Sequence, residues 1–257
     1  MRTSTRHLVA SLALLGFVAA ACGSDESDSG AAREGDITVF AAASLTAAFT
    51  EIGDAFMTEY PDATVTFNFA ASSELVAQIG EGAPADVFAS ADQGNMTKLT
   101  DAGNNATEPE LFATNLLEII VGPGNPKGIT GVADLADENL IVVVCAPEVP
   151  CGKYAAQIFE SAAVSVTPKS LEENVKAVVT KVTLGEADAG IVYRTDVTAA
   201  GDKAAGVEIP ADINVTAEYP IAVTKEAANA EGAQAFIDFV NGEQGQQILA
   251  SYGFLAP

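Results

Sequence analysis

The sequence predicts an α/β fold with largely parallel sheets, because short apolar strands alternate with helices along most of the chain. The clearest unit begins at residues 37–40, a β-branched and aromatic run that three alanines and Ser44 connect to a helix at 44–59. The next unit has the same order: a strand at 64–69, two alanines, Ser72 and a short helix. No stretch in the middle of the chain resembles a linker, so two lobes would require the chain to cross between them in extended segments.

Ser44 and Ser72 both stand where a strand passes through small residues into the start of a helix. The first backbone N–H groups of a helix lack intrahelical partners and the helix dipole is positive there, so this arrangement suits an anion. The alanines at 41–43 leave room for a ligand to reach the backbone. The alternative for Ser44 is that its hydroxyl only caps the helix.

The rest of the chain continues the alternation of strands and helices. Strands are predicted at 87–90, 115–121, 140–145, 165–168, 189–193 and 216–223, with an edge segment at 208–210. Helical segments are predicted at 74–80, 91–102, 132–136, 153–162, within 171–184, and at 196–200, 233–241 and 243–251. Candidate crossovers lie near Asn115 and Tyr219. A capping-box pattern at 170–173 favours a helix start at Ser170.

The first 35 residues are not expected to belong to the fold. Arg2 and Arg6 precede a short apolar segment that ends in Ala-Ala-Ala-Cys22, which resembles a lipobox. This pattern predicts a lipoprotein export signal at 1–21, cleavage before Cys22 and a lipid on that cysteine, followed by a flexible tether at 22–35. The protein is therefore expected outside the cytoplasm and anchored to the membrane. The alternative is a free cysteine at an ordinary cleavage site.

Composition restricts the possible partners. The signal contains two arginines and no carboxylates, so its removal leaves ten Lys and Arg against 35 Asp and Glu, a net charge of −25. Nucleic acid and anionic lipid surfaces are poor partners for such a protein. The sole histidine, His7, is lost with the signal, which excludes histidine catalysis and histidine metal ligation. About 220 residues remain, enough for two lobes of ordinary domain size.

Cys145 and Cys151 are the only other cysteines. Outside the cytoplasm we expect such a pair to form a disulfide, and the C-x5-C spacing is neither a redox motif nor a zinc site. Closing this short loop should contribute about 2 kcal/mol to stability in the chain-entropy model.

Five segments, taken in order, carry a resemblance to a known family. They are Phe40-Ala-Ala-Ala-Ser-Leu-Thr46, Gly82-Ala-Pro-Ala-Asp-Val-Phe-Ala-Ser-Ala-Asp92, Ala146-Pro-Glu-Val-Pro-Cys-Gly152, Gly190-Ile-Val-Tyr193 and Glu218-Tyr-Pro220. Together they resemble the periplasmic molybdate-binding proteins of bacterial ABC transporters, over residues 36–257. The resemblance implies the two-lobed periplasmic-binding-protein fold (type II), with the ligand in the cleft between the lobes. It places residues 36–114 and 219–257 in the first lobe and 115–218 in the second.

The resemblance also implies a set of ligand-binding residues. Its members are neutral donors: the hydroxyls of Ser44 and Ser72, the backbone amides of Cys151 and Val175, and the hydroxyl of Tyr193. The family often has alanine at the position of Cys151, but only the main chain is used there, and a bond to Cys145 would hold the loop. A free Val175 amide requires the helix to begin at Asn174 rather than at Ser170, and the resemblance favours Asn174.

The expected function is high-affinity binding of molybdate, and of tungstate, for delivery to the membrane permease of an ABC importer. A monomer without a cofactor or a directly ligated metal cation is expected. Lys153 and Arg194 flank the site in sequence and could steer an anion, although both suit the surface. One alternative is a binding protein of the same fold for sulfate, ferric iron or a small organic acid. The other, an enzyme, is disfavoured because neither serine has an activating histidine or a G-x-S-x-G elbow.

Overall fold

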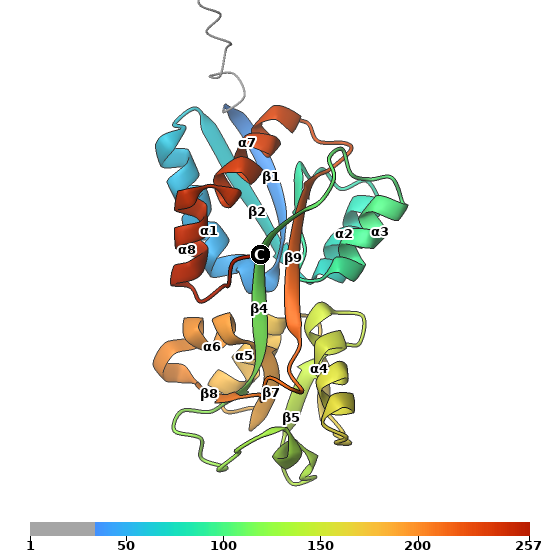
Figure 1. Ribbon diagram of the computed structural model, residues 1–257, viewed down its shortest axis with the longest axis vertical. Coiled ribbons are helices and arrows are strands. Elements are labelled where there is room, and N and C mark those ends of the chain that lie inside the picture. Colours follow the sequence, from blue (N-terminus) through green and yellow to red (C-terminus); the bar gives the residue numbers. More distant parts are fainter. Residues whose placement is uncertain (1–33) are drawn as a thin grey trace, which may run out of the picture.

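The computed structural model describes residues 34–257, so the predicted export signal, Cys22 and most of the predicted tether lie outside the described residues. The described chain forms two halves stacked along its longest axis (Figure 1). Two long strands, β4 (Glu110–Val121) and β9 (Thr216–Val223), run through both halves. No helix within 34–257 has the length and apolar character needed to span a membrane.

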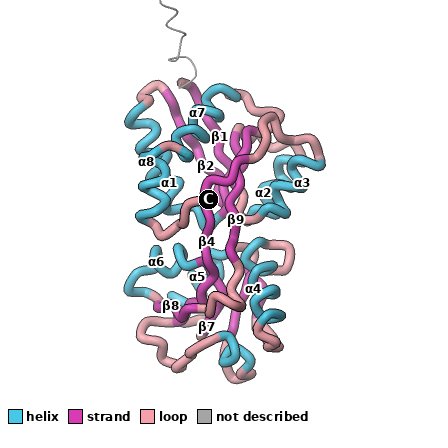
Figure 2. Tube along the Cα trace, viewed as in Figure 1, coloured by secondary structure: helices cyan, strands magenta, loops and turns pink. Residues whose placement is uncertain are grey.

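The upper half in Figure 1 is built on three parallel strands. β1 (Gly35–Ala42) lies between β2 (Ala63–Ala70) and β3 (Val87–Ala89), and β3 pairs antiparallel with β9. Its helices are α1 (Thr46–Glu59), α2 (Ser72–Gly80), α3 (Gln93–Asp101), α7 (Ala230–Asn241) and α8 (Glu243–Ser251). Figures 1 and 2 show α1, α7 and α8 on one side of these strands and α2 and α3 on the other.

Aromatic packing holds α1 against the upper sheet. Phe49, Ile52 and Phe56 recur at helical spacing and are fully buried. The rings of Phe49 and Phe56 lie 6.1 and 5.5 Å from the ring of Phe236 in α7, near-perpendicular in both pairs. Each such buried side chain stabilises the fold by about 1.5–3 kcal/mol, so the turn that follows β1 is carried on a rigid frame.

The lower half continues the sheet from β4. β7 (Ala189–Tyr193) pairs antiparallel with β4, and β5 (Val142–Cys145) and β6 (Ser170–Glu172) follow in parallel. β8 (Ala205–Glu208) also pairs with β4. The helices here are α4 (Pro150–Ser161), α5 (Val175–Thr183) and α6 (Arg194–Ala200), with short 3-10 turns at η3 (Val132–Ala136) and η4 (Gly201–Lys203). A further 3-10 turn, η2 (Ala43–Leu45), lies in the upper half between β1 and α1.

β4 is where the sheet divides between the halves. Hydrogen bonding is continuous through the nine strands of the described chain, but residues 110–116 of β4 pair with β9, whereas residues 117–121 pair with β7 and β8. Asn115 lies opposite Ala217, close to the point of division. The two extended segments in which crossovers were predicted are therefore paired with each other.

Several predicted boundaries are wrong. The strand expected at 165–168 is found at Ser170–Glu172, as β6. Pro168 has no N–H to donate, and pairing with β5 begins after this proline, where the N–H of Lys169 donates to the carbonyl of Val142. β4 begins five residues earlier than expected, and β8 lies at Ala205–Glu208 instead of 208–210. The helix expected at 153–162 begins three residues earlier, at Pro150, which places Cys151 in its first turn.

Candidate functional site

A small cavity lies where the two halves meet. The upper half lines it with residues 42–44, 71–72 and Ala91, and the lower half with residues 149–151, 174–175 and Tyr193. All five residues predicted to bind a ligand line it. The space inside it that is open to the centre of a water-sized sphere is about 10 Å³, close to the minimum that holds one water molecule.

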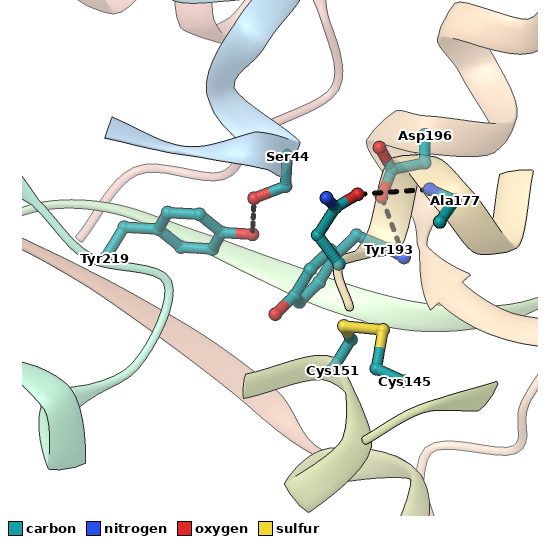
Figure 3. Close-up of a disulfide and its surroundings, with 8 residues drawn as sticks. Ser44, Cys145, Cys151, Ala177, Tyr193, Asp196 and Tyr219 are labelled. Carbon is teal, nitrogen blue, oxygen red and sulfur yellow. Dashed lines mark hydrogen bonds between the residues drawn. A yellow bond between two sulfur atoms is a disulfide. The ribbon is translucent and has the colours of Figure 1, made fainter. Parts of the chain in front are cut away.

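Ser44 does not cap α1. It lies in the 3-10 turn η2 between β1 and α1, and no side chain caps either helical segment there. Its hydroxyl instead lies 3.0 Å from the hydroxyl of Tyr219 in β9, as Figure 3 shows. The interpretation of Ser44 as only a helix cap is therefore wrong, and its side chain is turned to the junction of the two halves.

Ser72 is the first residue of α2 and is fully buried. Its hydroxyl oxygen accepts a hydrogen bond of 3.0 Å from the backbone N–H of Ala91. Because the oxygen is already an acceptor, the hydroxyl hydrogen is left to donate into the cavity that both residues line.

Cys151 supplies the first backbone N–H of α4, because Pro150 before it has none. No described residue accepts a hydrogen bond from this N–H. The predicted disulfide is confirmed: Cys151 is bonded to Cys145 at the end of β5. Next to it, Gly152 packs so closely that a Cβ would lie 2.1 Å from the Ala146 carbonyl oxygen. The amide is therefore held by a covalent bond and by a close backbone contact.

The helix that begins near Val175 is capped by Asn174, as the resemblance implied. The Asn174 side-chain oxygen accepts from the N–H of Ala177 at 3.1 Å, which leaves the Val175 N–H at the open end of α5. The capping-box pattern does not form a cap because Ser170 belongs to β6, where its hydroxyl contacts Glu172 and Lys181. The Val175 side chain is buried in the core.

Tyr193 ends β7 with its ring buried against the rings of Tyr154 and Tyr219, at 6.4 and 5.8 Å. Its backbone N–H donates to Asp196, while its hydroxyl points away from that carboxylate (Figure 3). Among the buried side-chain polar atoms of residues 34–257, this hydroxyl oxygen alone has no hydrogen-bond partner. Burial, and then the neighbouring Tyr219, raise the pKa of Tyr193 well above its ordinary value, so the group stays a neutral donor.

The nearby cations are paired with carboxylates and none lines the cavity. Lys153 is partly exposed, and its ammonium contacts the buried carboxylate of Asp92 at 2.7 Å. Lys176 contacts the buried Asp196 at 2.9 Å, which ties the first turn of α5 to α6. Arg194 is exposed and lies 3.9 Å from a carboxylate. Within residues 34–257, no cluster of acidic, cysteine or histidine side chains is placed to hold a metal ion.

Tyr219 and Asp92 are the residues that the sequence did not single out for the site. Both occur in segments quoted for the resemblance, but nothing in their local pattern shows that Tyr219 contacts Ser44, 175 residues away, or that Asp92 contacts Lys153. A ring of hydroxyls and free amides without a cation is suited to hold a small anion by hydrogen bonds.

Known proteins resemble this chain in sequence and in fold. A family model for bacterial extracellular solute-binding proteins matches residues 37–255. The molybdate-binding protein ModA of Mycobacterium tuberculosis H37Rv is 41% identical, with 97% of each chain covered. Among solved structures, the periplasmic molybdate-binding protein of Azotobacter vinelandii superposes with a TM-score of 0.72 at 20% identity, over 86% of this chain and 99% of that one. The sulfate-binding protein SubI of M. tuberculosis H37Rv superposes with a TM-score of 0.77 at 20% identity, covering 85% and 86%.

Proposed function

Because the chain belongs to the family of bacterial extracellular solute-binding proteins, whose members serve transporters and are not enzymes, we propose that it binds molybdate for delivery to the permease of an ABC importer. The observation that carries the proposal is the cavity between the halves, which collects hydroxyls and free amides and leaves the Tyr193 hydroxyl without a partner. Molybdate is a tetrahedral dianion whose oxygens accept hydrogen bonds in every direction.

The proposed ligand contacts come from both halves. The upper half contributes the hydroxyls of Ser44 and Ser72. The lower half contributes the backbone amides of Cys151 and Val175 and the hydroxyl of Tyr193. Three of the five positions lie in the first turn of α2, α4 or α5, where the helix dipole also favours negative charge. Enclosure excludes water and strengthens each bond, so a dianion can be held without a lysine or arginine in contact.

The cavity also limits the alternatives. Among residues 34–257, no arginine or lysine lines it to meet the carboxylate of an organic acid. Within the same range Tyr193 is the only tyrosine that lines it and no carboxylate does, which disfavours ferric iron. Sulfate remains the competing ligand because the sulfate-binding relative shares the fold, and at 20% identity that likeness concerns the fold alone. Tungstate has the shape and charge of molybdate and is expected to bind as well.

The proposal includes the arrangement of the chain. Residues 36–114 and 219–257 form one lobe and residues 115–218 the other, with β4 and β9 as the connection between them. The protein acts as a monomer outside the cytoplasm, held to the membrane by lipid on Cys22. Residues 22–35 then tether the binding lobes near the permease.

Calorimetric titration of the chain from residue 23 onward tests the proposed ligand. Molybdate and tungstate should bind with similar affinity, at least a hundredfold more tightly than sulfate or phosphate.

Tyr193→Phe should weaken molybdate binding about ten- to a hundredfold, because a hydrogen bond to a charged group contributes about 1.5–3 kcal/mol. Tighter binding of sulfate than of molybdate would overturn molybdate as the proposed ligand. The mass of the exported protein tests separately whether Cys22 carries a lipid.

A further prediction compares the loss of a neutral hydrogen-bond donor with the loss of a nearby cation, by their effects on molybdate binding. Ser72→Ala should weaken molybdate binding about ten- to a hundredfold at any salt concentration, because a short hydrogen bond inside a closed cavity is little screened. Arg194→Gln should mainly slow association, and its effect should fade as salt is added, because the exposed guanidinium acts at long range. Stopped-flow rates at low and high salt measure both. Loss of binding in Arg194→Gln at high salt, with Ser72→Ala intact, would contradict the neutral-donor mechanism.

A further inference from the structure

Tyr219 touches two residues of the proposed site, Ser44 through its hydroxyl and Tyr193 through its ring. It does not line the cavity, it is fully buried in β9, and its ring packs between those of Phe112 and Phe254, at 6.2 and 5.4 Å. Its hydroxyl lies 3.0 Å from the Ser44 hydroxyl, and from the positions of the oxygens either group could be the donor. Which one donates decides what Ser44 offers to a ligand.

The burial of Tyr219 decides the direction. Its hydroxyl is fully buried, and Ser44 Oγ is the acceptor that residues 34–257 place within hydrogen-bonding distance of it, at 3.0 Å. If Ser44 donated, the hydrogen of Tyr219 would be buried without an acceptor, which costs free energy. The Tyr219 hydroxyl therefore donates to Ser44. A hydrogen bond from Asn115, which lowers the pKa of Tyr219 against the larger rise caused by burial, fits this direction because an amide nitrogen can only donate.

We propose that Tyr219 is a positioning residue that holds the Ser44 hydroxyl as a donor to the bound anion. The Ser44 oxygen accepts from Tyr219, so its own hydrogen is left for the cavity, just as Ala91 leaves the hydrogen of Ser72 free. Both serines then act as donors, and a protonated oxyanion such as hydrogen phosphate finds neither of them ready to accept its proton. This inference rests on the proposed function and adds a source of selectivity to it.

Tyr219→Phe removes the hydroxyl and keeps the ring. It should weaken molybdate binding about five- to twentyfold, because Ser44 must then be oriented at binding. Hydrogen phosphate should keep its affinity or gain some, since Ser44 can now turn and accept, so the molybdate-to-phosphate affinity ratio should fall by at least the same factor. Tyr252→Phe is the matched control: its exposed hydroxyl contacts Glu51 at 2.7 Å, outside the cavity, and binding should not change.

A double-mutant cycle separates positioning from a general structural role. In a Ser44→Ala background, Tyr219→Phe should change molybdate affinity less than about twofold, because there is no hydroxyl left to orient. Additive losses, or an unchanged affinity ratio in Tyr219→Phe, would overturn the inference while the proposed function stands. Failure of the unmodified protein to bind any oxyanion would overturn the proposed function itself, and the inference with it.

Discussion

Gly152→Ala is expected to reduce molybdate affinity more than a hundredfold, the largest effect of any single methyl group at the site. The added Cβ would lie 2.1 Å from the carbonyl oxygen of Ala146 and 2.6 Å from that of Cys145, distances that real Cβ atoms do not show. Both obstacles are backbone, and the disulfide between Cys145 and Cys151 restrains the same segment, so the first turn of α4 must move. The Cys151 amide moves with it. Calorimetry measures the loss, and denaturant unfolding should show about 1–3 kcal/mol less stability.

Gly245→Ala provides the matched control for this experiment. Its added Cβ would lie 2.3 Å from the carbonyl oxygen of Phe239, a comparable backbone clash, but α8 contributes nothing to the cavity. The variant should lose stability and keep molybdate affinity within about threefold for the folded fraction. If Gly152→Ala bound molybdate like the unmodified protein, the Cys151 amide would not be a ligand contact.

Lys153→Met is expected to weaken molybdate binding about tenfold or more, with an effect that persists at high salt. Lys153 in α4 pairs with Asp92 at the start of α3, and beside it the Tyr154 hydroxyl donates to the Ala91 carbonyl at 3.2 Å. These contacts join the two halves next to the cavity. Without Lys153, the buried Asp92 carboxylate lies unpaired near an incoming dianion and opposes closure. Breaking a buried pair costs about 3–5 kcal/mol, and the 31% exposure of the lysine side chain reduces that figure.

Two further variants make the test specific. Lys181→Met removes a lysine of similar exposure, 33%, from Glu172, but this pair lies wholly within the lower half, so binding should stay within about twofold. Asp92→Asn combined with Lys153→Met should recover most of the lost affinity, because asparagine still caps α3 and no charge is left unpaired. Equal losses of molybdate affinity in Lys153→Met and Lys181→Met would show that the ion pair between the two halves has no special role in binding. Isothermal titration at two salt concentrations distinguishes the outcomes.

Local pattern was sufficient for the elements whose residues are apolar and periodic. The strand at 189–193, the strand at 216–223 and the helix that ends at Ser251 match the prediction, because apolar runs and spacing alone specify them. The prediction was wrong where pairing between distant segments decides. Residues 110–114 become strand because β9 pairs with them, and β6 takes its place from β5.

The sequence by itself determined the α/β class and the five residues that line the cavity, the latter through motifs that resemble a known family. It also determined the pairing of the cysteines, since only two lie within the folded part. Only the tertiary structure decided that Ser44 contacts Tyr219, that Asp92 neutralises Lys153 and that the Tyr193 hydroxyl is left free. The physical reason is that the direction of a hydrogen bond and the pairing of a buried charge depend on groups 61 to 175 residues apart, and nothing in a local pattern carries that information.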